Sequence, residues 1–170
     1  MRFWKNLLLP VLLLALVSCA EVPDSARIDT ARTVPGLQGL ELELTQRIEL
    51  TPAMRTALEH GIALRLAYRI EACGHLRQRA LWLRHAPLKR QYELQLEGQA
   101  QVRDFARLPA LEAGLDRVRL PLDLPVDADC TGQVQMQLDL AALPTPLRFP
   151  AFFHPEDWRL RSTVLNWGTP

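Results

Sequence analysis

The three cysteines are the side chains of this sequence with the clearest capacity for chemistry. Cys19 closes an apolar N-terminal run, whereas Cys73 and Cys130 lie in the body of the chain. Two thiols in an exported domain favour one disulfide, and we predict a bond between Cys73 and Cys130. Free thiols are the alternative. Metal ligation with His75 is disfavoured, because the two cysteines lack the Cys-x-x-Cys spacing of a zinc site.

Side chains suited to acid–base or metal chemistry gather at His154, Glu156 and Asp157. Pro155 favours a turn here, and a metal or acid–base site is the alternative. Neither serine beyond Cys19 lies in a Gly-x-Ser-x-Gly elbow, and the sequence contains no Gly-x-Gly-x-x-Gly or His-Glu-x-x-His motif. We therefore predict no catalytic residue, no cofactor and no resident metal.

Composition and charge narrow the class of protein. Lys and Arg number 20 against 19 Asp and Glu, a formal net charge of +1, so charge gives no reason to expect nucleic-acid binding. Hydrophobic residues make up 48% and charged residues 23%, which is typical of a folded domain and excludes a wholly disordered or fibrous chain. A chain of 170 residues is expected to form one domain.

The first residues, 1–18, predict a secretory signal peptide. Arg2 and Lys5 precede an apolar run over residues 7–17, which is too short to cross the ~30 Å hydrocarbon core of a bilayer. The end of this run, Leu16-Val17-Ser18-Cys19, resembles the lipobox of bacterial lipoproteins. The resemblance implies that Cys19 becomes the acylated first residue of the mature chain and attaches it to a membrane. An ordinary signal peptide or an uncleaved anchor is the alternative.

The residues after Cys19 bear on location and on domain limits. Because Ala20 rather than Asp follows Cys19, the lipoprotein sorting pattern implies the outer membrane, facing the periplasm, with the inner membrane as the alternative. Residues 19–39 are rich in Pro, Gly, Ser and Arg without periodicity, and they predict a flexible tether. Residues 40–170 predict a single β-rich domain.

Alternation of apolar and polar residues is the main pattern of this domain, and it is typical of strands with one wet face. The pattern predicts strands over residues 40–50, 62–70, 77–84, 92–96, 118–124, 134–140 and 158–167. Pro121 cannot donate a ladder hydrogen bond, so its strand should lie at a sheet edge or kink there. Thr51-Pro52 begins a helix that Gly61 ends, and Pro109 to Ala113 predicts a second, shorter one.

These elements predict an all-β fold, an antiparallel two-sheet sandwich of about seven to eight strands with two short helices. A curved antiparallel sheet wrapped on the helices, an α+β fold, is the alternative. In either fold, the side chains with chemical capacity lie at strand ends and turns rather than in the middle of a sheet.

Three features of the domain are candidates for interaction. A cluster of Arg77, Arg79, Arg84, Lys89 and Arg90 concentrates positive charge across one predicted hairpin. The proline-rich segment 143–158 either covers one end of the sandwich or displays a docking surface. Its aromatic residues are Phe149, Phe152, Phe153 and Trp158. Exposed sheet edges are the third candidate, because they can accept a strand from a partner.

Several short segments, in this order, resemble the exported proteobacterial family called domain of unknown function 4390. They are Ala57 to Leu64, Leu88 to Tyr92, Leu111 to Leu115, Leu143 to Leu147 and Asp157 to Trp167. The resemblance covers residues 40–167 and implies a β-rich domain of the cell envelope. It supplies no catalytic residues.

Together these features predict a non-catalytic module of the cell envelope that binds another envelope protein or has a structural role. The first alternative is a carrier or sensor of an apolar or lipid ligand, which would need an enclosed interior cavity. A less favoured alternative is an enzyme with an unrecognised site, which would need convergent polar groups in a cleft.

Overall fold

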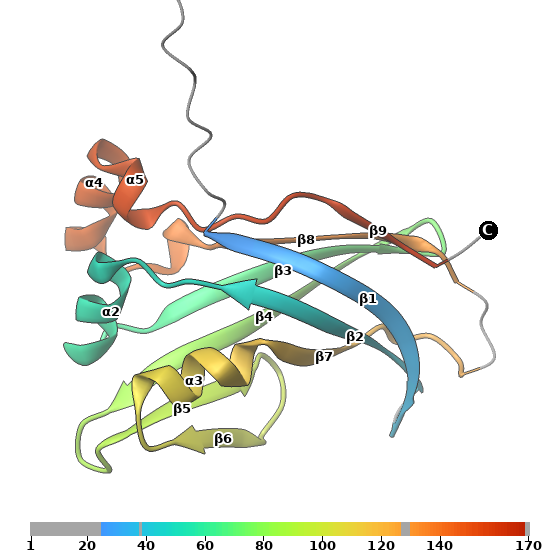
Figure 1. Cartoon of the computed structure of the whole chain (residues 1–170), viewed down its shortest axis with the longest axis horizontal. Helices are drawn as coiled ribbons and strands as arrows, with labels where there is room; N and C mark the ends of the chain where they lie inside the picture. Colours follow the sequence, from blue (N-terminus) through green and yellow to red (C-terminus); the bar gives the residue numbers. More distant parts are fainter. Residues whose placement is uncertain (1–24, 38, 127–129, 169–170) are drawn as a thin grey trace, which may run out of the picture.

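The chain folds into two antiparallel sheets packed face to face, as the alternation predicts (Figure 1). The computed structural model describes residues 25–37, 39–126 and 130–168. The small sheet has the order β1-β2-β7, and the large sheet the order β6-β5-β4-β3-β8-β9. The small sheet contains β1 (Ala26–Gly36), β2 (Gly39–Ile48) and β7 (Arg117–Pro121). The large sheet contains β3 (Leu64–Ala72), β4 (His75–Ala86), β5 (Gln91–Leu96), β6 (Val102–Phe105), β8 (Gly132–Leu138) and β9 (Leu165–Trp167).

The core lies between the sheets and is built from the apolar positions of the alternating strands. Leu42 and Leu44 of β2 are fully buried, as are Leu64 and Leu66 of β3. Most buried residues of the described structure are apolar, and Gln46 is one of the few buried polar ones.

Gln46 breaks the apolar face of β2, and its partners explain why the break is tolerated. Its side-chain amide donates to the Tyr68 hydroxyl of β3 and to the Leu115 carbonyl, each at 2.8 Å. Because a buried amide without partners would be costly, these bonds make Gln46 a polar tie between the two sheets and the segment before β7. Burial raises the pKa of the Tyr68 hydroxyl, which therefore stays neutral.

Short helices lie at one end of the sandwich and beside β7 (Figure 1). They are α2 (Pro52–Glu59), α3 (Leu108–Leu115), α4 (Thr145–Phe153) and α5 (Pro155–Trp158), with a 3-10 turn η1 over Leu140–Ala142. The predicted first helix is confirmed, and the Thr51 hydroxyl caps it by accepting a hydrogen bond from the Met54 N–H. The prediction of only two helices is wrong, because the proline-rich segment forms α4 and α5 (Figure 1).

The prediction of a flexible tether over residues 19–39 is wrong for most of that range. Ala26–Gly36 form β1, which pairs antiparallel with β2 along its whole length. A bulge between Ile28 and Thr30 shifts the register, so inward positions change from even to odd numbers and no simple alternation is visible in the sequence. The folded domain therefore begins at residue 25 or before. The signal peptide and Cys19 lie outside the described residues.

The last predicted strand, over residues 158–167, is also corrected. Only Leu165–Trp167 form a strand, and Trp158 belongs to α5. Between them one isolated β-bridge pairs Arg161 with Gln137 of β8, and the Ser162 hydroxyl accepts a hydrogen bond from the Met136 N–H. The expectation that Pro121 marks a sheet edge is confirmed, because β7 is an outer strand of the small sheet. Among the helices of the described residues, none is long and apolar enough to cross a membrane.

Candidate binding groove

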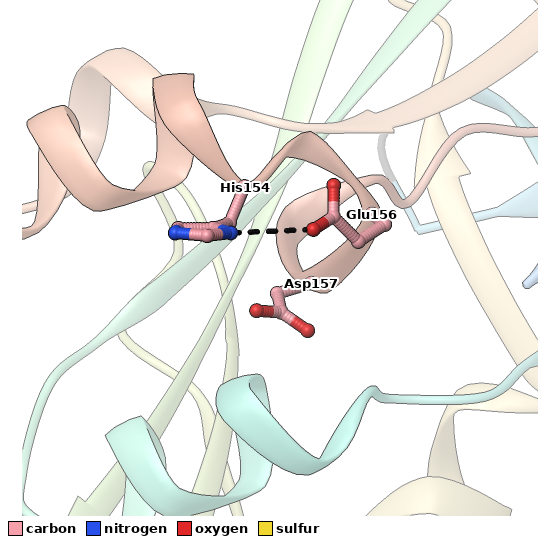
Figure 2. Close-up of side chains that lie close together, drawn as sticks. All are labelled: His154, Glu156 and Asp157. Atoms are coloured by element: carbon pink, nitrogen blue, oxygen red, sulfur yellow. Dashed lines mark hydrogen bonds and ion pairs between the residues drawn. The ribbon is translucent and has the colours of Figure 1, made fainter.

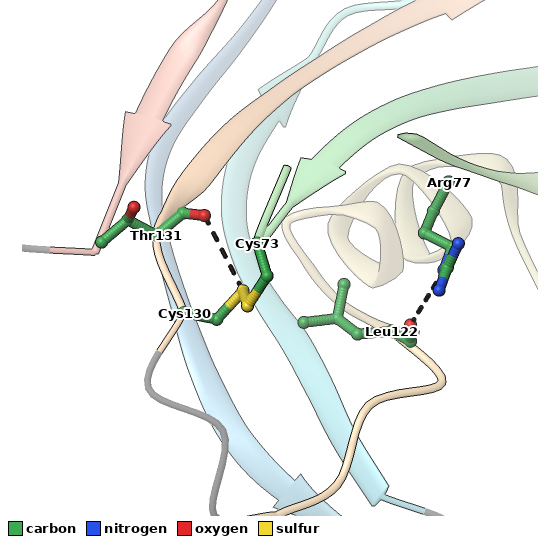
Figure 3. The surroundings of a disulfide bond; sticks show 5 residues. All are labelled: Cys73, Arg77, Leu122, Cys130 and Thr131. Carbon is green, nitrogen blue, oxygen red and sulfur yellow. Dashed lines mark hydrogen bonds between the residues drawn. A yellow bond between two sulfur atoms is a disulfide. The ribbon is translucent and has the colours of Figure 1, made fainter. Parts of the chain in front are cut away.

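The predicted disulfide between Cys73 and Cys130 is confirmed. It joins the turn after β3 to the residue pair before β8, with the two Cα atoms 5.2 Å apart (Figure 3). Cys73 and Gly74 both have left-handed backbones, φ 49° and 74°, which suits a two-residue hairpin turn between β3 and β4. The Cys73 N–H also donates to the Thr131 carbonyl at 3.2 Å. Neither thiol is then available as a metal ligand.

The predicted arginine cluster is divided between the two faces of β4. Arg77 and Arg79 share the inward parity of Leu81, and their Nε atoms donate to the carbonyls of Leu122 and Pro121 at 3.4 and 2.8 Å (Figure 3 shows the first). They tie the large sheet to the end of β7. Arg77 and Arg79 therefore do not share a face with Arg84, because alternate strand residues face opposite sides.

The other members of that cluster lie elsewhere. The Arg84 guanidinium stands 5.2 Å from the centre of the Trp82 ring on the outer face of the large sheet, and it also donates to Gln95. Arg90 occupies the β4–β5 turn with a left-handed backbone, φ 52°. Lys89 pairs with Glu93 at 3.0 Å.

The proline-rich segment both covers the core and presents aromatic rings. Ala151 of α4 and Trp158 of α5 are buried in the core. Phe149 and Phe153, four residues apart on α4, are 68% and 71% exposed. The side chain of Phe152 lies outside the described set. One face of these short helices therefore covers the core, and the other face leaves two aromatic rings exposed.

The cluster His154, Glu156 and Asp157 lies at the start of α5, fully on the surface (Figure 2). His154 Nδ1 is 3.3 Å from a Glu156 carboxylate oxygen, and ligand atoms of all three residues lie within 4.8 Å of one another. A bond from its own backbone N–H, and then the bond to His154, lower the pKa of Glu156. His85 is on β4, where it stacks on Tyr92. His85 therefore lies on a different element from the cluster of His154, Glu156 and Asp157.

A groove that the sequence did not predict runs beside β7. The small sheet has three strands against six in the large one, so β7 leaves part of β4 and β5 without a covering strand. The groove encloses about 380 Å³ and its floor is Leu81, Leu94 and Leu96. One wall is Arg117 to Arg119 of β7, and the other carries Gln99, Gln101 and Arg103.

The backbone of β7 faces this groove with unpaired groups. Asp116 accepts from the Gln46 N–H and Leu122 donates to the Leu40 carbonyl, so the even-numbered residues of this stretch bond to β2. The backbone N–H and C=O of Arg117 and Arg119 consequently point away from β2. Arg79 occupies the next outward carbonyl, that of Pro121. The usable edge is therefore short.

Positive charge rims the groove. Arg103 lies with its guanidinium 5.3 Å from the centre of the Phe105 ring, and Arg117 is exposed. Glu43 lies directly opposite both Arg32 of β1 and Arg119 of β7 on the outer face of the small sheet. Hydrogen bonds from Arg32 and then Arg119 lower the pKa of Glu43. Among the lining residues of the groove, Glu41 is the one carboxylate against Arg103, Arg117 and Arg119, which leaves a surplus of positive charge.

Two other hollows bear on the carrier alternative. One of about 470 Å³ lies between β1 and β9, and one of about 210 Å³ lies on the outer face of β3 and β8. All three hollows are open to solvent, while the space between the sheets is filled by core side chains. The carrier alternative gains no enclosed cavity from the described residues.

The fold and the groove define a β-sandwich domain that has a sheet edge above an apolar floor. The chain belongs to the family described as Domain of unknown function (DUF4390), whose profile matches residues 23–168. Comparison with curated proteins gave no match, and comparison with solved structures gave none either. The sequence signalled the edge through Pro121, but the floor could be found only from the strand order.

Proposed function

We propose that this protein is a non-catalytic, lipid-anchored module of the cell envelope that binds an extended segment of a partner protein beside β7. The observation that carries the proposal is the free edge of Arg117 and Arg119 above the floor of Leu81, Leu94 and Leu96. Strand addition uses these two features together, because edge groups supply main-chain hydrogen bonds and a neighbouring floor receives alternate side chains.

The geometry also defines the kind of segment that fits. A strand added to β7 would pair with Arg117 and Arg119 and place one set of side chains on the leucine floor. Its other side chains would face the arginines of the rim, so acidic residues suit those positions. Arg79 at Pro121 and α3 before Arg117 limit the pairing to a span of roughly 10 Å, three residues at about 3.4 Å each. The partner segment is short, alternating and acidic.

Lipid anchoring belongs to the same proposal. It rests on the predicted signal peptide, residues 1–18, and on the lipobox resemblance of Leu16 to Cys19. The expected location is the outer membrane, facing the periplasm. Membrane fractionation of the wild type and of Cys19→Ala tests this part, and a variant that stays in the same membrane fraction would refute it.

The groove is tested by photocrosslinking in intact cells. A photoreactive residue at Gln101, on the groove wall, is expected to capture one dominant envelope protein at the 380 Å³ groove. The same residue at Gln78, on the outer face of β4, is the control and should not capture it. Mass spectrometry then identifies the captured peptide, which should be extended in character, with apolar and acidic residues in alternation.

A matched pair of variants separates main-chain pairing from side-chain charge. Arg119→Pro removes the outward N–H, and Pro121 already occupies the equivalent position two residues along the same strand. Arg119→Ala loses the same ion pair with Glu43 but keeps the N–H. We expect the Gln101 crosslink to fall at least tenfold in Arg119→Pro and by much less in Arg119→Ala. Equal crosslinking in both variants would rule out strand addition.

A further inference from the structure

The described part of the chain begins at the end of the sandwich that α4 and α5 form. Ser25 is the first described residue, and its hydroxyl donates to the carbonyl of Arg159, which directly follows α5, at 2.8 Å. The Ser25 carbonyl in turn accepts from the Glu49 N–H. Figure 1 shows the start of β1 beside this end of the molecule. Any lipid anchor that precedes residue 25 is therefore connected to the domain at its α4–α5 end.

The distance to such an anchor is short. Cys19 and Ser25 are six positions apart in the sequence. An extended chain spans at most about 3.6 Å per residue, so Ser25 lies within roughly 22 Å of Cys19. The tether expected from the sequence, which ran to residue 39, would have allowed the domain to stand far from the bilayer. Pairing of β1 with β2 removes that freedom.

Helix α4 is apolar on two opposite faces. Leu147 and Ala151 pack against the core, whereas Phe149 and Phe153 are largely exposed. A helix that is apolar all round is usually buried on all sides, and here the core supplies only one side. Paired aromatic rings on an exposed helix face suit the boundary between headgroups and acyl chains.

The charges around this end are nearly balanced. Arg148 of α4 and Arg159, which follows α5, are exposed, and so are Glu156 and Asp157 of α5. Arg148 is held by a bond from its Nε to the Leu143 carbonyl at 2.7 Å. With both signs present, attraction to anionic lipid is not the main contribution, and the two rings must provide the contact.

From these observations we infer that α4 is a membrane seat: Phe149 and Phe153 enter the interfacial layer of the bilayer that holds the lipid of Cys19. The inference rests on the lipid anchoring proposed above and adds to it a fixed orientation. The α4–α5 end faces the membrane, and the β4–β5 turn, with Leu88 fully exposed, belongs to a different part of the surface.

The test uses the full-length lipidated protein in vesicles of phosphatidylethanolamine and phosphatidylglycerol, with plain or brominated acyl chains. Bromine quenches nearby tryptophan. Phe149→Trp is expected to lose at least half of its added fluorescence in brominated vesicles. Leu88→Trp, the matched control at a 102% exposed position, should lose none, and the wild type corrects for the native tryptophans. Vesicle flotation is measured in the same samples.

The outcomes are distinct. Quenching of Phe149→Trp alone supports the seat. Flotation without quenching of Phe149→Trp overturns the seat and leaves lipid anchoring intact, and so does equal quenching of both variants. Failure to float refutes the anchoring and the seat together, while the groove beside β7 is unaffected by any of these results. Both substitutions are at exposed positions, so unchanged melting temperatures confirm that the variants are folded.

Discussion

Glu43 is the residue whose environment departs most from its position in the sequence. Its parity on β2 places it on the outer face of the small sheet, yet its side chain is only 5% exposed because Arg32 and Arg119 flank it. Both arginines are directly opposite in the strand register. The pattern of the sequence could not reveal this, because Arg32 lies in β1, which the bulge hides from an alternation analysis.

This environment predicts a pH-dependent contribution of Glu43 to stability. Its pKa in the folded state lies below the reference value of 4.5, so its stabilising effect is complete above pH 4.5 and is lost as the pH falls through the folded pKa. Glu43→Gln should therefore be less stable than the wild type at pH 7, with the difference shrinking in acid. Urea unfolding from pH 7 down to pH 2 measures this.

The control for that comparison is Glu41→Gln. Glu41 lies two positions along the same face of β2, and no ion pair among the described residues includes it. Its loss changes the net charge equally. If both variants show the same dependence on pH, the effect comes from net charge rather than from the two arginines.

Among the elements, α2 shows how one side chain can fix both a helix and its neighbour. The Thr51 hydroxyl accepts from the Met54 N–H and donates to the Asp157 carbonyl of α5. We predict that Thr51→Ala lowers the free energy of unfolding by about 1 kcal/mol, the usual cost of a lost N-cap. Urea denaturation measures the change. Thr163→Ala, at an exposed threonine outside the helices, should change it by less, and equal losses would contradict the role of the cap.

Prediction of the elements succeeded where one physical signal dominated. Strands β3 and β8 alternate over their whole length and β2 does so except at Gln46, while Thr51-Pro52 marks a helix start that local chemistry alone determines. It failed where two signals conflicted. The four prolines of segment 143–158 suggested an irregular chain, but Pro146 and Pro155 fall in the first turns of α4 and α5, where a missing N–H costs nothing.

At the scale of the whole molecule, the sandwich fold could be predicted from strands that alternate between an apolar and a solvent-exposed face. The groove could not be predicted in this way. It depends on three strands facing six, and therefore on which strands pair. β3 pairs with β4 next to it in the sequence and with β8 far beyond it. The sequence pattern does not reveal that β3 pairs with β8, because every alternating strand has a similar apolar face.

The disulfide links the ends of β3 and β8, which are distant in the sequence, and its removal should lower the stability of the whole domain. Cys73 and Cys130 are 57 positions apart, and closing such a loop is worth about 4 kcal/mol in the chain-entropy model. We expect a reductant to lower the free energy of unfolding by up to about that amount. Urea unfolding with and without reductant measures it. The Cys73→Ser/Cys130→Ser variant should not respond to reductant, and an unaffected wild type would contradict the prediction.

The place of β3 between β4 and β8 also sets an order of events for a chain that crosses a membrane from its N-terminus. β3 and β4 emerge and can form their hairpin early, while β8 is still on the far side. Until Gly132–Leu138 arrive, one edge of β3 is open to strands of other chains. Cys73 likewise waits as a free thiol until Cys130 has crossed. A chain exported in this way therefore exposes an open strand edge and a free thiol until its C-terminal part has crossed the membrane.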